Sequence, residues 1–207
     1  MPRILGITGN IACGKTAVGQ MLLALGAERY IDADALVHQL YEKDQPVARR
    51  VAELFGSAVM AADGGVDRQA LGAIVFHDTE AMKRLEQIVH PAVGEALLKE
   101  LLGVSPDGIA VIDAVKLLEG GSGALCQSKW LVTCSEEQEL KRLIARNHLS
   151  YEEAHARVRV QPPLSSRLAL VDEVIDNSGT LEETQRQVSA AFDRFCKKFP
   201  ISSHYYN

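Results

Sequence analysis

The chain has 207 residues, of which 47% are hydrophobic and 24% charged, enough to bury a core and remain soluble. Its 22 lysine and arginine residues stand against 27 aspartate and glutamate residues, which gives a formal net charge of -5. This acidic balance argues against nucleic acid as a partner, because binding a phosphate backbone needs clustered cations. The length favours one domain with insertions over two independent domains.

Cysteine spacing and hydropathy indicate the compartment. The four cysteines lie far apart and form no Cys-x-x-Cys pair, which predicts neither a zinc site nor a disulfide framework. The apolar stretch from Ile4 to Ile7 is too short for a signal peptide. No run approaches the roughly 20 apolar residues of a membrane span. We therefore expect a cytoplasmic protein with no membrane partner.

The first elements in chain order are a strand, a glycine-rich turn and a helix. Residues 3–8 form a short apolar run that predicts a buried strand of a parallel sheet. Apolar residues between positions 18 and 25 recur at the spacing of one helix face, and Gly26 is placed to end that helix. A second strand is expected at residues 29–31, followed by Asp32-Ala33-Asp34 and a helix-compatible stretch.

The middle of the chain has helical periodicity, and in the remainder of the chain predicted strands alternate with predicted helices. Residues 46–102 are predicted almost wholly helical, with one turn at Asp63-Gly64-Gly65. Further strands are expected at residues 108–112, 130–134 and 174–175. The alternation of strands and helices predicts a three-layer α/β fold with a parallel sheet.

Three Ser/Thr-x-x-Glu/Gln patterns read as capping boxes that mark helix starts. They pair Ser135 with Gln138, Ser150 with Glu153, and Thr180 with Glu183.

The segment from Gly9 to Thr16 reads Gly-Asn-Ile-Ala-Cys-Gly-Lys-Thr and fits the phosphate-loop pattern G-x-x-x-x-G-K-[ST]. In such a loop the backbone N–H groups and the following helix N-terminus surround phosphates, while Lys15 bridges the outer ones and Thr16 offers its hydroxyl to Mg²⁺. An ordinary glycine turn is the alternative, which the position between a strand and a helix disfavours. The predicted ATP-binding residues of the loop are Asn10, Ile11, Ala12, Cys13, Gly14, Lys15, Thr16 and Ala17.

Cys13 is an unusual residue for this loop. A thiol beside Lys15 at a helix N-terminus should have its thiolate favoured, which would make the loop sensitive to oxidation. The simpler interpretation, which we favour, is that Cys13 is a small residue filling a tight loop.

Other motifs narrow the class of phosphate-loop protein. A GTPase would need an Asn-Lys-x-Asp motif, which is not present. The apolar run at 109–112 ends in a single acid, Asp113, whereas translocating ATPases carry an acid pair and are usually larger. Small-molecule kinases remain, which catalyse phosphoryl transfer mainly by positioning and charge neutralisation.

Further motifs follow one another at compatible spacing along nearly the whole chain. They are Gly6-Ile7-Thr8-Gly9, Ile31-Asp32-Ala33-Asp34, Asp63-Gly64 with Asp67-Arg68, Leu85-Glu86 with His90-Pro91, Leu117-Leu118-Glu119, and Gln161-Pro162-Pro163-Leu164 with Val174-Ile175-Asp176-Asn177. In these motifs the sequence resembles the dephospho-coenzyme A kinase family. The resemblance implies transfer of the γ-phosphoryl group of ATP, with Mg²⁺, to the ribose 3′-hydroxyl of dephospho-coenzyme A.

The resemblance also implies a domain organisation. Residues 1–33 and 103–207 would form a P-loop kinase core that binds the nucleotide. Residues 34–102 would form a helical acceptor-binding insertion, and residues 147–163 a lid that closes over ATP.

Lys15, Asp34 and Arg146 are the catalytic residues that we predict. A carboxylate near the acceptor hydroxyl can take its proton, and the resemblance gives that place to Asp34. Asp32 or Asp113 would act on Mg²⁺ through water, together with Thr16. The alternative is that Asp32 and Asp34 only cap the next helix.

Two arginines four residues apart, Arg142 and Arg146, should project from one helix face. The resemblance suggests Arg142 against the adenine and Arg146 on the phosphates, with Asn177 also beside the adenine. The alternative is a solvated helix face that includes Glu139 and Lys141.

Arg68 and His90 are the polar residues that we expect near the acceptor. Since His90 precedes a proline, a structural position at a helix end is the alternative for it.

The chain departs from the family pattern at several positions. The loop is poorer in glycine, and Ala12 is acceptable only if its backbone is not left-handed. Lys116 stands where the family usually has leucine, and we favour a solvent-facing or ion-paired position for it over a phosphate contact. Arg167 stands where the family often has lysine, which keeps the charge and alters its geometry.

Two other functions stay open from sequence. One is a kinase of a nucleoside monophosphate or a sugar acid, which the acceptor motifs disfavour. The other is a nucleotide-binding regulator without turnover, which the presence of Lys15, Thr16 and Asp34 disfavours. The sequence does not predict an oligomeric state.

Overall fold

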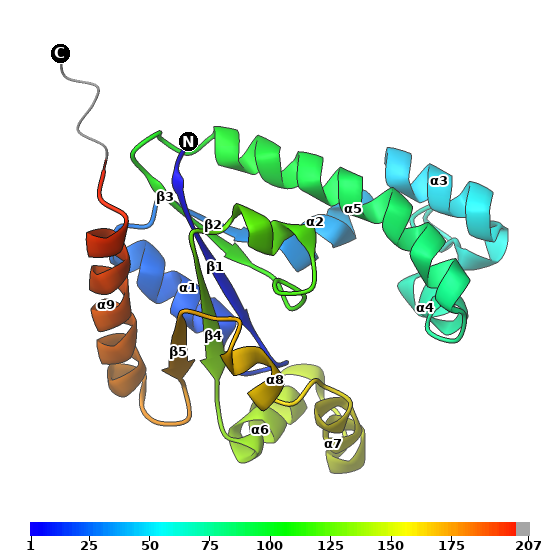
Figure 1. Cartoon of the computed structure of the whole chain (residues 1–207). Coiled ribbons are helices and arrows are strands. Elements are labelled where there is room, and N and C mark those ends of the chain that lie inside the picture. Colours follow the sequence, from blue (N-terminus) through cyan, green and yellow to red (C-terminus); the bar gives the residue numbers. More distant parts are fainter. Residues whose placement is uncertain (202–207) are drawn as a thin grey trace. The chain divides into compact units, whose positions relative to one another are not determined.

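A β-sheet forms the centre of the larger part of the molecule in the computed structural model, which describes residues 1–201 (Figure 1). In these residues the sheet has five strands in the order β2-β3-β1-β4-β5. The strands are β1 (Arg3–Gly9), β2 (Arg29–Asp32), β3 (Ile109–Asp113), β4 (Ser128–Thr133) and β5 (Glu173–Asp176). The expected strands and the α/β class are confirmed.

Strand β1 lies in the middle of the sheet and pairs in parallel with both β3 and β4, and β4 pairs in parallel with β5. The register places Leu5 opposite Val111 on β3 and opposite Ser128 on β4. Strand β3 is buried along its whole length, and β1 from its second residue onward. Continuous apolar runs are therefore found where both faces of a parallel strand are covered.

Helices connect and flank these strands. The helices are α1 (Lys15–Ala24), α2 (Ala33–Leu40), α3 (Pro46–Phe55), α4 (Arg68–Val75), α5 (Thr79–Leu102), α6 (Glu136–Asn147), α7 (Tyr151–Arg159), α8 (Ser165–Leu168) and α9 (Leu181–Lys198), with 3₁₀ turns η1 (Ser57–Val59) and η2 (Gly121–Leu125). None of the helices in residues 1–201 combines the length and the apolar character that crossing a membrane would need.

The chain divides into two compact units. One contains Met1–Ile31 and the chain from Leu101 onward, and the other is Asp32–Glu100. The nucleotide-binding and acceptor-binding roles that the sequence suggested for residues 1–33 with 103–207 and for residues 34–102 stay predictions.

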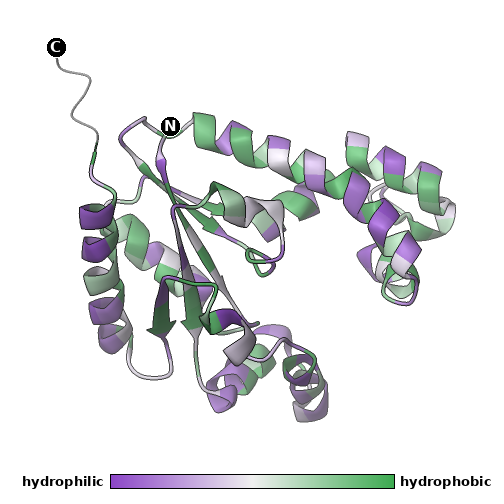
Figure 2. Ribbon diagram, viewed as in Figure 1, coloured by the Kyte–Doolittle hydropathy of each residue, from purple (hydrophilic) through white to green (hydrophobic). Residues whose placement is uncertain are grey.

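The core of the sheet unit joins β-strands to α1 and α9. Leu22 of α1 and Val188 of α9 are fully buried in one cluster with Trp130 of β4. Figure 2 shows hydrophobic residues along β4, in keeping with its burial. A Cβ added at Gly6 of β1 would meet the side chains of Leu117 and Cys126, so these side chains cover the strand closely at this position.

The second unit has a hydrophobic core of its own. Val51 of α3, Leu71 of α4 and Leu85 of α5 belong to one buried cluster. The predicted turn at residues 63–65 is confirmed, since Gly65 donates its N–H to the Asp63 carboxylate at 2.9 Å. These contacts give the helices of this unit a common core.

Helices start at all three predicted caps, and the reciprocal capping box forms at two of them. Ser150 and Thr180 form reciprocal capping boxes with Glu153 and Glu183. At Ser135 only half of the expected box forms, because its hydroxyl accepts from the Gln138 N–H while its own N–H donates to Ser178. The loop after β5 therefore takes the place expected for the Gln138 side chain.

The His90-Pro91 pair does not end a helix, contrary to the alternative raised for His90. Both residues lie inside α5, which continues to Leu102. A proline inside a helix has no N–H for the backbone hydrogen bond of its position, so proline normally destabilises a helix interior. Buried Val89 and Leu97 on either side of the pair anchor the helix and offset this loss.

Candidate active site

The phosphate loop connects β1 to α1, as the sequence predicted. Gly14 is the N-cap of α1 and has a left-handed backbone with φ 99°. A Cβ at this position would lie 2.0 Å from the Asn177 side-chain nitrogen, so only glycine fits. Because Gly14 brings no capping side chain, the first N–H groups of α1 stay available to an anion.

Ala12 adopts the left-handed backbone that we expected the loop to avoid, with φ 59°. The expectation is wrong, and the conformation costs about 1–2 kcal/mol for a residue with a Cβ. Packing explains why it persists: Ile11 and Ala12 lie against Leu140 and Leu143 of α6. The surrounding side chains therefore impose a conformation that the residue itself disfavours.

Cys13 is fully buried in the core of the sheet unit. Burial raises the pKa of its thiol to about 11, although the Lys15 ammonium lowers it. The expectation of a favoured thiolate is thus wrong, because loss of hydration outweighs the nearby charge. Cys13 fills space in a tight loop.

The carbonyl group of Cys13 is the anchor for two residues from distant segments. Arg142 of α6 donates to it at 3.1 Å and Asn177, after β5, at 2.9 Å. Arg142 also donates to the Asn177 carbonyl at 3.0 Å, and the Asn177 amide oxygen accepts from Thr184. Of the predicted ATP-binding residues, the structure therefore brings Cys13, Arg142 and Asn177 together.

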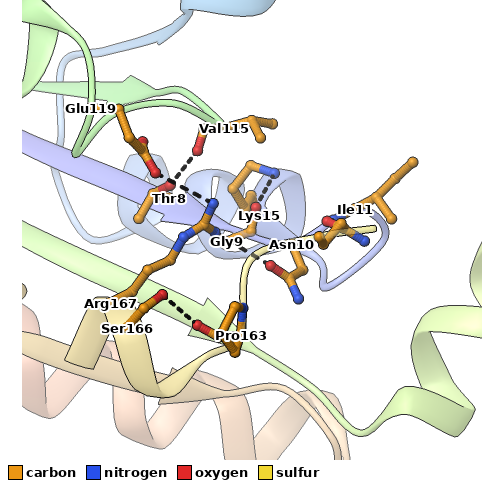
Figure 3. A network of polar contacts seen from close by, with 11 residues as sticks. Thr8, Gly9, Asn10, Ile11, Lys15, Val115, Glu119, Pro163, Ser166 and Arg167 are labelled. Atoms are coloured by element: carbon orange, nitrogen blue, oxygen red, sulfur yellow. Dashed lines mark hydrogen bonds and ion pairs between the residues drawn. The ribbon is translucent and has the colours of Figure 1, made fainter. Parts of the chain in front are cut away.

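The other end of the loop is held by the segment that follows α7 (Figure 3). Gln161 accepts a hydrogen bond of 2.7 Å from the Ile11 N–H, and Arg167 donates one of 3.3 Å to the Asn10 side chain. Lys15 donates to the carbonyl of Gly9 at 3.3 Å. The loop is thus fastened at both ends by side chains from the C-terminal third of the chain.

Sequence reasoning missed Glu139 as a residue of this site. The sequence named Glu139 only within the alternative of a solvated helix face, but the structure buries this residue. Burial raises the pKa of its carboxyl, although a hydrogen bond with Asn10 acts in the opposite direction. Leu143, four residues further on, is fully buried, and this spacing was the signal that both side chains share the inner face.

The two predicted lid-root arginines have different surroundings. Arg142 is half-buried against the loop, whereas Arg146 is exposed and donates to the side chain of Asn147 at 3.0 Å. Helical spacing put both on one face of α6, but only Arg142 lies where its guanidinium reaches the phosphate loop.

The remaining candidates of the sheet unit lie in α1 and at or after the end of β3. Thr16, in the first turn of α1, is exposed and Ala17 is half-buried. Asp113 ends β3, is buried and accepts a hydrogen bond from the Tyr30 hydroxyl. Lys116 is exposed, in line with the solvent-facing position that we favoured.

Four candidates belong to the second unit. Asp32 is the N-cap of α2 and accepts from the Ala35 N–H at 2.9 Å, so its capping role is real. Asp34 lies in the first turn of α2 and is half-buried. Arg68, at the start of α4, and His90, in α5, are both exposed.

A phosphate loop on a parallel α/β sheet, with lysine and arginine side chains at its two ends, defines a P-loop kinase. The Dephospho-CoA kinase sequence model matches residues 3–183 of this chain. The chain therefore belongs to the dephospho-CoA kinase family.

Individual relatives and solved structures match nearly the whole chain. The chain is 42% identical to the dephospho-CoA kinase of Symbiobacterium thermophilum, covering 94% of this chain and 82% of the relative. Among solved structures, TT1252 from Thermus thermophilus is 34% identical with a TM-score of 0.79, over 93% of this chain and 97% of that one. The dephospho-CoA kinase from Campylobacter jejuni is 25% identical with a TM-score of 0.65, over 96% and 99%. The resemblance seen in the sequence motifs is confirmed.

Proposed function

We propose that this chain transfers the γ-phosphoryl group of ATP to the ribose 3′-hydroxyl of dephospho-coenzyme A, which yields coenzyme A and ADP. The observation that carries the proposal is the phosphate loop: its glycine N-cap leaves the α1 N–H groups to an anion, and Lys15 stands beside them. Membership of the dephospho-CoA kinase family supports dephospho-coenzyme A as the acceptor. The enzyme would work in the cytoplasm, without nucleic acid or membrane as a partner.

Charge neutralisation is the role we assign to the residues around the triphosphate. Backbone N–H groups of residues 10–17 would bind the phosphates, and Lys15 and Arg146 would offset charge on the transferred group. Arg142 and Asn177 would lie beside the adenine, where their bonds to Cys13 support them.

Mg²⁺ would be held by few protein ligands, as is usual when phosphate oxygens complete its shell. The Thr16 hydroxyl is the direct ligand that we propose, and its exposed place at the start of α1 fits that role. Asp32 or Asp113 would contact the ion through water.

The acceptor side of the reaction is assigned to residues 34–102. Asp34 would accept the proton of the acceptor hydroxyl as the oxygen attacks phosphorus. Arg68 and His90, both exposed, would contact the acceptor. Residues 147–163, which contain α7, would form the lid that excludes water from the reaction.

A coupled assay of ADP release with Mg²⁺ and ATP tests this function. We expect turnover with dephospho-coenzyme A and far slower turnover with adenosine or AMP as acceptor. A preference for AMP would indicate another small-molecule kinase. ATP binding without acceptor-dependent ADP release would indicate a regulator, and either result would contradict the proposal.

A further inference from the structure

Arg167 is a buried cation beside the phosphate loop to which the reaction scheme above gives no role. It lies in α8 and is only 4% exposed. Figure 3 shows its side chain directed from α8 toward Asn10 and Glu119, next to the start of the loop. Burying a guanidinium removes its hydration, so its charge and its five N–H donors need strong partners.

The partners of Arg167 within the sheet unit are weak for a buried charge. The hydrogen bond to Asn10 is long, at 3.3 Å, and goes to a neutral amide. The nearest carboxylate, on Glu119, is 3.8 Å away on a side chain that is 51% exposed. Among residues 1–201 the buried Nε of Arg167 has no hydrogen-bond partner. The guanidinium therefore has more positive charge and more donors than this structure uses.

Gln161 adds a second spare donor to the same place. Its amide oxygen accepts from the Ile11 N–H, but its buried Nε2 has no hydrogen-bond partner in the part of the chain that the structure describes. Arg167 and Gln161 thus contact adjacent residues of the loop, Asn10 and Ile11, and both retain a buried N–H donor.

Arg142, at the other end of the loop, has better hydrogen-bond partners within the protein than Arg167 has. Both of its terminal nitrogens donate to backbone carbonyls, of Cys13 and of Asn177, at 3.1 and 3.0 Å. These bonds fasten the loop and give each terminal nitrogen a carbonyl partner. Arg167 differs because its donors are in surplus, and a surplus of buried donors with net positive charge is matched by an anion.

We propose that Arg167, with Gln161 as a second donor, forms an anion subsite at the Asn10–Ile11 end of the loop that binds a phosphate group of the nucleotide. The identification of the anion as a nucleotide phosphate rests on the proposed function, whereas anion binding itself does not. Glu119 pairs with the same guanidinium when no phosphate is bound, and it would therefore compete with a phosphate for this guanidinium.

The test measures binding of inorganic tripolyphosphate to the full chain by titration calorimetry. For Arg167→Met we expect affinity about ten- to a hundredfold weaker, since a charge-assisted hydrogen bond is lost. Arg167→Lys keeps the positive charge and should stay within about fivefold of the wild type. Glu119→Gln removes the competing carboxylate and should bind tripolyphosphate about two- to fivefold more tightly.

The opposite signs of these effects separate phosphate binding from a purely structural ion pair. If the only role of Arg167 were to hold Glu119, Arg167→Met and Glu119→Gln would both weaken tripolyphosphate binding or would both leave it unchanged. Either of these two results would overturn the proposal. Should Arg167→Met fail to fold, Glu119→Gln decides alone, with tighter binding in support and unchanged or weaker binding against. Wild-type turnover of dephospho-coenzyme A is assayed in parallel, so that its absence counts against the function and not against the subsite.

Discussion

The side-chain amide of Asn177 donates a hydrogen bond of 2.9 Å to the backbone carbonyl of Cys13, although 164 residues separate them. Asn177 is 2% exposed, and its amide oxygen accepts from the Thr184 hydroxyl at 2.9 Å. The loop after β5 is thereby tied to the phosphate loop and to the first turn of α9 by one side chain.

Removal of this side chain should destabilise the protein. In Asn177→Ala the buried Cys13 carbonyl and Thr184 hydroxyl each lose a partner, and we expect the free energy of unfolding to fall by about 2–4 kcal/mol. Urea denaturation measures this change. As a control, Asn147→Ala alters an exposed asparagine and should stay within about 0.5 kcal/mol of the wild type. Equal effects in the two variants would contradict the role given to Asn177.

Two glycines allow a matched comparison of the effect of a Cβ. In Gly14→Ala the new atom would lie 2.0 Å from Asn177 Nδ2 on a backbone with φ 99°. We expect unfolding free energy to fall by at least about 1–2 kcal/mol, and ATP affinity to fall with it.

Gly94→Ala should have the opposite sign. Gly94 lies within α5, and a Cβ there would meet no atom within 4 Å. Because alanine loses less backbone entropy in a helix, we expect a gain of about 0.5–1 kcal/mol in urea denaturation. A stabilising Gly14→Ala would contradict the predicted clash with Asn177, and a destabilising Gly94→Ala would contradict the open space found around Gly94.

Substitution of the acid that ends β2, Asp32, and of the acid in the first turn of α2, Asp34, should have different effects. We expect Asp34→Asn to lower kcat by about a hundred- to ten-thousandfold with ATP affinity retained, because the acceptor proton loses its base. Asp32→Ala removes the cap of α2, so unfolding free energy should fall by about 1 kcal/mol. Steady-state kinetics and urea denaturation of both variants distinguish the two roles. A fully active Asp34→Asn would remove the assignment of Asp34.

Cys13 should make the folded state sensitive to alkali. Its pKa rises from the ordinary value of 9.0 to about 11 in the folded chain. Between these values the unfolded chain releases the thiol proton and the folded chain keeps it. This contribution to stability is therefore complete below pH 9 and is lost as the pH rises toward about 11.

The corresponding slope is about 1.4 kcal/mol of unfolding free energy for each pH unit in that window, as an upper limit. Urea denaturation of the wild type and of Cys13→Ala from about pH 8.5, below the window, to about pH 10.5, within it, should give a shallower decline for the variant. Identical slopes would mean that Cys13 does not titrate in this way.

Local sequence was sufficient for the elements around the loop. The apolar run of β1, the Gly9–Thr16 pattern and the periodicity of α1 are contiguous, so the strand, turn and helix could each be predicted from neighbouring residues. The capping boxes at Ser150 and Thr180 were predictable for the same reason. At Ser135 the prediction was half wrong, because the N–H found a partner in Ser178, 43 residues away.

Sequence failed where packing overrides a local preference. Ala12 takes a left-handed backbone because α6 and α7 pack against the loop, and the burial of Glu139 follows from the same packing. For Cys13, local charge favoured the thiolate, but burial decided the pKa. For Ala12 and Cys13 the outcome depends on side chains from distant segments, whereas for Glu139 the spacing to Leu143 was a local signal.

The sequence by itself determined the class of protein and its family, since the phosphate loop and the family motifs are short contiguous patterns. Only the tertiary structure decided which side chains hold that loop: Arg142 and Asn177 at Cys13, and Gln161 and Arg167 at its first residues. The physical reason is that hydrogen bonding and burial depend on distance in space. Parallel strands bring segments more than a hundred residues apart to one end of the sheet. No periodicity in the sequence predicts which of these residues come into contact.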